Sequence, residues 1–150
     1  MEGTAASLVI EMVEYNSEKY RQMVQLRFDV LRAPLGLDFT DEFLAKDADN
    51  ILIGAFVNDE IIGCCQLQEL VDGVYQLRQM AVSNNLQSGG IGTKIVQFAE
   101  ALVIEKGGRK ITLHGREVAV GFYRKLGYTT VGKMFMEVGI PHWEMEKELS

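Results

Sequence analysis

The chain has 150 residues, of which 47% are hydrophobic and 24% are charged. This length and balance predict one globular domain over residues 1–150, with its core at about 8–149, that buries about 70% of its unfolded surface. The net charge of −6 argues against a nucleic-acid-binding protein, because phosphate backbones select clustered Lys and Arg. The apolar runs are too short to cross a bilayer and the start is unlike a signal peptide, so we expect a cytoplasmic protein that does not enter membranes.

The first half of the chain predicts one main helix among four strands. Apolar runs indicate strands at Leu8–Val13, Ile51–Val57, Ile61–Leu70 and Val74–Val82. Asn16 and Ser17 can cap a helix that continues to Arg32, where Pro34 and Gly36 stop it. A short helix is expected near Glu42–Ala45. Turn residues at 58–60 and 71–73 predict that the middle strands form an antiparallel meander.

Two adjacent cysteines lie in the third of these predicted strands. Cys64 and Cys65 should point to opposite faces of the sheet, because side chains alternate along a strand. They offer neither a disulfide framework nor a metal cluster, so we expect a reduced protein without a bound metal.

The second half predicts alternating helices and strands. A helix over Thr93–Lys106 should end at the glycines 107 and 108, and Lys110–His114 should be a strand parallel to its predecessor. A second helix at Glu117–Leu126 and two strands, roughly Tyr128–Val138 and His142–Leu149, complete the chain. The expected class is α+β: a mixed, mostly antiparallel sheet of about seven strands with about four helices.

A glycine-rich segment precedes the helix at 93–106. It reads Gln87-Ser88-Gly89-Gly90-Ile91-Gly92-Thr93, and three glycines in four positions indicate special backbone geometry rather than core packing. Unpaired N–H groups at a helix start, with the positive end of the helix dipole behind them, form an anion site suited to phosphate. The dinucleotide fingerprint fails because Ile95 stands where a third glycine is needed. The P-loop pattern fails because the order is Gly92-Thr93-Lys94.

The pattern that fits this segment is Gln-x-x-Gly-x-Gly directly after a strand ending Met80-Ala81-Val82. It resembles the pyrophosphate loop of the GNAT superfamily of N-acetyltransferases, as does the element order. The segment Gly121-Phe122-Tyr123-Arg124-Lys125-Leu126-Gly127-Tyr128 is similar to a second motif of that family. The resemblance implies transfer of an acetyl group from acetyl-CoA to an amine. It also implies that CoA is bound at Met80, Ala81, Val82, Gln87, Ser88, Gly89, Gly90, Ile91, Gly92 and Thr93.

The same resemblance implies that Tyr123 protonates the departing CoA thiolate, and a phenol is a suitable acid for that step. The alternative is an aromatic residue packed beneath the sheet. Gln76 stands where some family members carry a catalytic glutamate. The base is therefore Glu69, Glu117 or a water chain.

The acceptor amine is not indicated by any residue constellation. Arg27, on the apolar stripe of the first helix, and His142, in the last hairpin, are the candidate substrate contacts. A homodimer through the last strands is in keeping with sheets of this kind. The alternative function is a non-catalytic acyl-CoA-binding or interaction module on the same fold.

Overall fold

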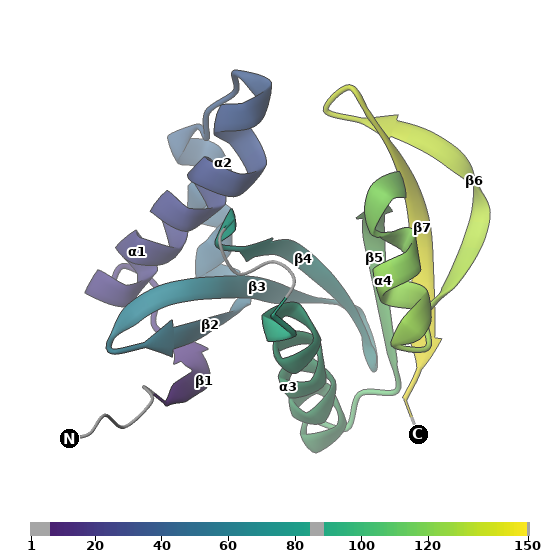
Figure 1. Cartoon of the computed structure of the whole chain (residues 1–150). Coiled ribbons are helices and arrows are strands. Elements are labelled where there is room, and N and C mark those ends of the chain that lie inside the picture. The colour runs from purple at the N-terminus through teal and green to yellow at the C-terminus, as the bar shows by residue number, and fades with distance from the viewer. Residues whose placement is uncertain (1–6, 85–88, 150) are drawn as a thin grey trace. The chain divides into compact units, whose positions relative to one another are not determined.

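Seven strands form one mixed sheet in the order β1-β2-β3-β4-β5-β7-β6 in the computed structural model, which describes residues 7–84 and 89–149 (Figure 1). The strands are β1 (Leu8–Val13), β2 (Ile51–Val57), β3 (Glu60–Val71), β4 (Val74–Val82), β5 (Lys110–Arg116), β6 (Thr129–Glu137) and β7 (Ile140–Glu148). The α-helices of the described part are α1 (Glu18–Arg27), α2 (Asp41–Ala45), α3 (Ile91–Glu105) and α4 (Val120–Lys125). β4 and β5 pair in parallel, whereas β7 is antiparallel to both β5 and β6. The predicted fold class is confirmed.

Two compact units make up the chain. The first comprises residues 1–66 and 79–99, and the second comprises residues 67–78 and 100–150. The first unit therefore holds the helix α1 and the start of α3, and the second holds β5, α4 and the final hairpin.

The core of the first unit lies between α1 and the strands β1–β3. Ser17 caps α1 by accepting a hydrogen bond from the backbone N–H of Tyr20, 3.1 Å away. The core side chains are Val13, Tyr20, Met23, Leu52, Phe56, Cys64 and Ala81. Since this set includes residues of α1 together with Cys64, α1 covers the face of β3 to which Cys64 points.

Gly63, the neighbour of Cys64, faces the opposite helix. A Cβ at Gly63 would stand 2.6 Å from Cδ1 of Ile95 and 3.2 Å from Cγ2 of Ile91, both in the first turns of α3. The absence of a side chain therefore lets α3 approach β3 closely. Adjacent residues of a strand point to opposite faces, so α1 and α3 cover opposite faces of β3 (Figure 1).

The sequence predicts one helix that continues to Arg32. The helix that starts at Glu18 instead stops being an α-helix after Arg27. After Arg27 it becomes a π-helix over Phe28–Arg32, closed by the Ala33 N–H donating to the Phe28 carbonyl, and then a 3₁₀ turn over Ala33–Leu35. Pro34 lies in this turn, and the ring of a proline is incompatible with a continuing α-helix. The hydrophobic spacing alone predicted the helix correctly but not its change of winding.

The second unit is built on β5 and its neighbours. Val74–Leu77 of β4 pair with Lys110–Leu113 of β5, and β7 lies along the other side of β5. The buried hydrophobic side chains of this unit are Leu67, Tyr75, Leu77, Leu102, Val103, Ile111, Leu113, Tyr123, Tyr128, Met145 and Leu149. The predicted helix over Glu117–Leu126 is a 3₁₀ turn at Glu117–Ala119 followed by α4.

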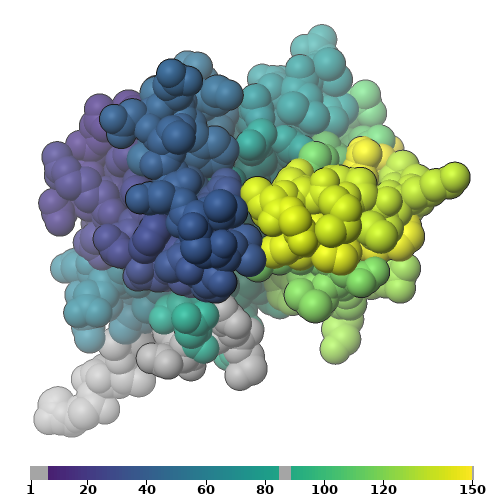
Figure 2. Space-filling model, turned by 90° about the horizontal axis from the view of Figure 1, so that it is seen from above, coloured from purple at the N-terminus to yellow at the C-terminus, as the bar shows by residue number. Residues whose placement is uncertain are grey.

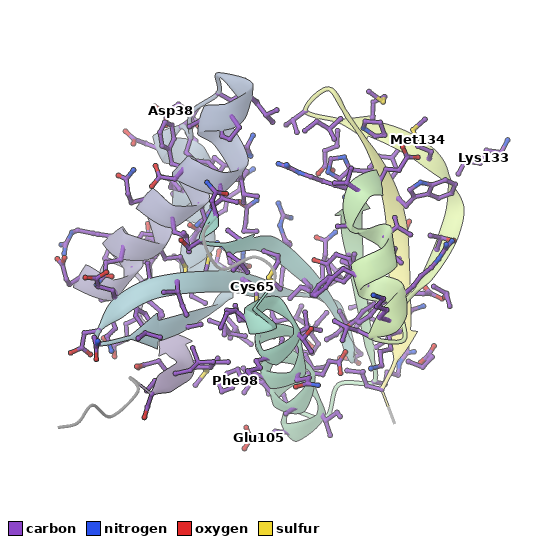
Figure 3. All side chains as sticks on the ribbon, in the orientation of Figure 1. Asp38, Cys65, Phe98, Glu105, Lys133 and Met134 are labelled. Carbon is purple, nitrogen blue, oxygen red and sulfur yellow. The ribbon has the colours of Figure 1, made fainter. Side chains whose placement is uncertain are left out.

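The final hairpin turns earlier than expected. The turn consists of Val138 and Gly139, both with positive φ, and Pro141 lies within β7 opposite Met136. Positive φ at both central residues is typical of a two-residue hairpin turn. A register shift between Val131 and Phe135 bulges β6. Lys133 and Met134 in this bulge are exposed and point outward (Figure 3), and the yellow-green atoms of the hairpin stand at the surface in Figure 2.

The end of α3 provides a test of the packing. Gly107 has φ +82° and donates to the Ile104 carbonyl, while the Gly108 N–H donates to the Val103 carbonyl, which is the hydrogen-bond pattern of a Schellman cap. The predicted helix end at these glycines is confirmed. A Cβ at Gly108 would stand 2.9 Å from the carbonyl oxygen of Val103 and 3.0 Å from Cε1 of Tyr75.

We predict that Gly108→Ala lowers the free energy of unfolding by about 1–3 kcal/mol, because backbone atoms must shift to admit the methyl group. Gly121→Ala is the control: Gly121 is helical with open space at its Cβ, so the change should raise stability by about 0.5–1 kcal/mol. Urea denaturation measures both. Equal stability of the Gly108→Ala variant and the unchanged protein would contradict the packing described.

Candidate active site

The fourth strand carries an irregular residue next to the segment expected to hold the cofactor arm. Gln79 has φ +53°, a left-handed conformation in the middle of β4. Beyond it, Met80 and Val82 are half-buried and Ala81 is buried. The Ser83 N–H donates to the Ile62 carbonyl at 2.8 Å, so the end of β4 remains attached to β3. The main chain therefore changes direction at Gln79, while β3 supports the last residues of β4.

The glycine segment meets α3 at Gly90. Gln87 and Ser88 lie outside the described residues; Gly89 and Gly90 form an exposed turn. Gly90 has φ +80°, and its carbonyl accepts from the Lys94 N–H at 3.2 Å. Among the described residues, apart from its chain neighbours and its own helix backbone, none has an atom within 4 Å of the position that its Cβ would take. The α3 turn thus begins at Gly90, and the N–H groups of residues 91–93 precede the first bond of the helix. Such groups, with the helix dipole, favour a bound anion.

The helix behind this turn is firmly anchored. Ile95, Val96 and Ala99 are fully buried, and Gly63 of β3 provides the space into which Ile91 and Ile95 pack. A buried helix face keeps the N–H groups at its start in a fixed direction. Sequence reasoning missed Gly63, although a glycine inside an apolar strand pattern is a recognised sign of close approach by another element.

Tyr123 lies in α4 of the second unit and is 7% exposed. Its ring makes edge contacts with Phe122 and Tyr128, at centroid distances of 4.9 and 5.9 Å. Gly115 of β5 allows the ring to approach, since a Cβ there would stand 3.4 Å from Cδ2 of Tyr123. The glycine segment belongs to the first unit and Tyr123 to the second, so their joint role stays a prediction.

The two candidate bases are both exposed: Glu69 in β3, and Glu117 at the start of the 3₁₀ turn before α4. Gln76, expected from the sequence to stand where some relatives carry a glutamate, accepts a hydrogen bond from Nη1 of Arg78 at 3.3 Å. The same Nη1 donates to Oε1 of Gln68 at 3.0 Å. This part of β3 and β4 therefore carries a guanidinium held by two amides. The choice of general base among Glu69, Glu117 and a water chain stays a prediction.

The two histidines come together in the second unit, which the sequence did not indicate. His114 Nδ1 lies 3.0 Å from Oε1 of Glu137, and His142 Nε2 lies 3.8 Å from Oε2 of the same carboxylate. Both imidazoles contact the Phe135 ring. His142 is 4% exposed, and its Nδ1 lies 2.8 Å from the Ile140 carbonyl. A carbonyl only accepts, so this nitrogen carries the proton, and in the neutral ring Nε2 is the basic nitrogen.

Arg27, the other candidate substrate contact, is fully buried in the first unit. Nη1 donates to Oδ2 of Asp47 at 2.7 Å, and Asp47 also accepts from the Tyr20 hydroxyl at 2.6 Å and from Nε2 of Gln66 at 2.9 Å. Burial, followed by the hydrogen bond to Asp47, raises the pKa of Tyr20 well above its usual range. Nη2 has no hydrogen-bond partner among the described residues. The assignment of Arg27 to the acceptor stays a prediction.

A family model for the acetyltransferase (GNAT) domain matches residues 37–149. The chain belongs to the GNAT family of acetyltransferases. It is similar to two Bacillus subtilis (strain 168) proteins: the uncharacterized protein YyaT, 35% identical over 75% of this chain and 76% of that one, and the uncharacterized N-acetyltransferase YjcF, 24% identical over 91% and 98%. It also shares its fold with a crystal structure of aminoglycoside 6′-N-acetyltransferase complexed with coenzyme A. That likeness has a TM-score of 0.77 and 20% identity, over 95% of this chain and 97% of that chain.

This GNAT chain is therefore an acyltransferase enzyme, and its predicted family and enzyme class are confirmed. Within residues 7–84 and 89–149, no group of three His, Cys, Asp or Glu side chains is arranged to hold a metal ion. None of the helices in the same ranges is long and apolar enough to cross a membrane.

The two buried cysteines of β3 provide a test of the burial through their reactivity. Burial raises the pKa of the Cys64 thiol to about 12, and burial raises that of Cys65 (Figure 3) well above its usual range. Since a raised thiol pKa keeps the unreactive neutral form at pH 8, we predict that a disulfide reagent such as DTNB reacts slowly with the native protein. Both thiols should react rapidly in denaturant. Rapid reaction of either cysteine in the folded protein at pH 8 would contradict the burial.

Proposed function

We propose that this GNAT enzyme moves an acetyl group from acetyl-CoA to a primary amine of a small molecule or a protein. The observation that carries the proposal is the left-handed Gly90 at the start of α3, the helix that follows the strand β4 in the chain. This geometry would direct backbone N–H groups toward a bound anion, and the family resemblance implies that this anion is the pyrophosphate of CoA. The fold shared with a CoA-complexed acetyltransferase supports the choice of co-substrate.

We assign the cofactor to the first unit. Main-chain groups of Met80–Val82 would pair with the pantetheine arm like an added strand, and backbone N–H groups from Ser88 to Thr93, beside Gln87, would hold the pyrophosphate. The net charge of −6 does not by itself favour a bound anion, so fixed backbone dipoles would supply the attraction at this site.

The chemical step proposed is direct attack within a ternary complex. A neutral amine adds to the thioester carbonyl carbon, the carbon–sulfur bond breaks, and the thiolate takes a proton from the Tyr123 hydroxyl. The amine gives up its own proton to Glu69, Glu117 or solvent. Holding both reactants together supplies much of the acceleration, so a dedicated base is not essential to the reaction. His142 is the proposed acceptor contact, since its side chain is fixed by the Ile140 carbonyl.

Tyr123→Phe tests the acid. We predict that kcat falls about a hundredfold while the KM for acetyl-CoA is unchanged, because only the proton donor to the leaving thiolate is lost. Tyr128→Phe is the matched control: it removes a buried hydroxyl that donates to Oε2 of Glu100 at 2.8 Å, so it should cost about 1–3 kcal/mol of stability with little effect on kcat. CoA release across a panel of amines measures turnover. Unchanged turnover of Tyr123→Phe would exclude the acid role.

Gly90→Leu tests the anion site. We expect CoA affinity to fall at least about tenfold, because the side chain would occupy the space in front of the helix start and the φ of +80° would be strained. Gly107→Leu, at the other end of the same helix, carries matched strain: its φ is +82° and its Cβ position is equally open. Titration calorimetry with CoA compares the two. If both variants bind CoA like the unchanged protein, the anion site is not at Gly90.

A further inference from the structure

The left-handed backbone at Gln79 requires an explanation from its surroundings. A residue with a Cβ avoids positive φ because the side chain crowds its own carbonyl, and such a conformation persists only where neighbouring contacts hold it. Gln79 is neither glycine nor in a turn; it lies inside β4, one residue before Met80. Contacts within the first unit must therefore stabilise this conformation.

Two side chains reach Gln79 from other elements. Nε of Arg27, at the end of α1, donates to the Gln79 side-chain oxygen at 3.4 Å. The Cys64 thiol in β3 donates to the Gln79 carbonyl at 3.7 Å. Arg27 thus contacts the side chain and Cys64 the main chain of the strained residue.

Arg27 is itself immobilised by a buried polar network. Its guanidinium pairs with Asp47, whose carboxylate is held by the Tyr20 hydroxyl and by Gln66. The side chains of Arg27 and Asp47 are 0% and 4% exposed. Asn50 continues the network by donating to Oε1 of Gln66 at 3.0 Å. These contacts join Arg27 in α1 to the 3₁₀ turn Lys46–Asp49 and to β3, while Arg27 itself reaches β4 at Gln79.

This network is a poor device for stability alone. Two buried charges lose their hydration, and well-packed apolar residues often serve a core as well or better. Nη2 of Arg27 also has no hydrogen-bond partner among the residues that the structure describes, although the guanidinium lies over the Phe39 ring. What an arginine provides, and an apolar residue cannot, is a rigid fork that bonds Asp47 and Gln79 with separate nitrogens.

We propose that Arg27 is a positioning residue that holds Gln79 in its left-handed conformation and thereby sets the course of Met80–Val82. This inference rests on the proposed binding of the acetyl-CoA arm along that segment. In this proposal Arg27 acts through Gln79, in place of the contact with the acceptor amine that its place on the first helix suggested. Asp47 and Tyr20 fix the direction of the guanidinium, and the Cys64 thiol supports the main chain by donating to the Gln79 carbonyl.

Arg27→Lys is the first variant. Lysine keeps the charge that pairs with Asp47 but has one nitrogen in place of the fork, so it cannot bond Asp47 and Gln79 in the same geometry. We expect the KM and Kd for acetyl-CoA to rise about fivefold to thirtyfold, the factor that corresponds to the strain of one left-handed residue, with a smaller change in kcat. A rise confined to the KM of the amine would instead make Arg27 an acceptor contact and overturn the proposal.

Substitutions at Gln79 test whether Arg27 acts on acetyl-CoA binding through Gln79. Glycine adopts positive φ without strain, whereas alanine keeps the strain and loses the contact with Arg27. Gln79→Ala should therefore bind acetyl-CoA more weakly than Gln79→Gly. Combined with Gln79→Gly, Arg27→Lys should lose most of its effect on acetyl-CoA affinity, because the glycine no longer needs to be held. Equal effects of Arg27→Lys in both backgrounds would show that Arg27 does not act through Gln79.

Urea unfolding of the same variants without acetyl-CoA separates this inference from the proposed function. Gln79→Gly should be more stable than Gln79→Ala, and the coupling between positions 27 and 79 should appear in the folding free energies as well. If the unchanged protein does not bind acetyl-CoA, the proposed function fails, yet unfolding still reports the coupling. If acetyl-CoA binds and the coupling is absent in both measurements, the positioning role alone is wrong.

Discussion

The buried ion pair between Arg27 and Asp47 is the interaction on which the first unit depends. The two groups lie 2.7 Å apart with almost no exposed surface, so neither can lose its partner without leaving an uncompensated charge. The pair is tolerated because Tyr20 and Gln66 donate further hydrogen bonds to Asp47. These bonds join α1, the turn before β2, and β3. The position of α1 on the sheet is thus specified by directional contacts as well as by apolar packing.

The candidate anion site is built by a different means, from backbone geometry and close packing. Gly90 starts α3 with a conformation that other residues avoid, and Gly63 lets the first turns of the helix pack directly on β3. Neither glycine contributes a functional side chain. Because the N–H groups are fixed by the buried face of the helix, the proposed site would hold a phosphate through the backbone and not through basic side chains.

The second unit has its own polar arrangement beside a hydrophobic core. β5 carries Ile111, Leu113 and Gly115 toward the core that includes Tyr123 and Met145, and its alternate residues include His114. His114 then meets Glu137 from β6 and, through that carboxylate, approaches His142 from β7. One face of this part of the sheet thus packs against the proposed acid Tyr123. The opposite face carries titratable groups.

The sequence by itself determined the element order, the mixed sheet, a helix cap at Asn16 or Ser17, the helix end at Gly107 and Gly108, and the family. Each of these follows from periodicity or from residues a few positions apart. Only the tertiary structure decided which distant side chains meet: Arg27 with Asp47 and Gln79, Gly63 with Ile95, and His114 with His142 through Glu137. The His contacts depend on a β6 bulge whose register no local pattern specifies. An arginine on the apolar stripe of a helix is likewise compatible with two roles, a ligand contact or a buried ion pair. The position of its partner in the fold decides between these roles.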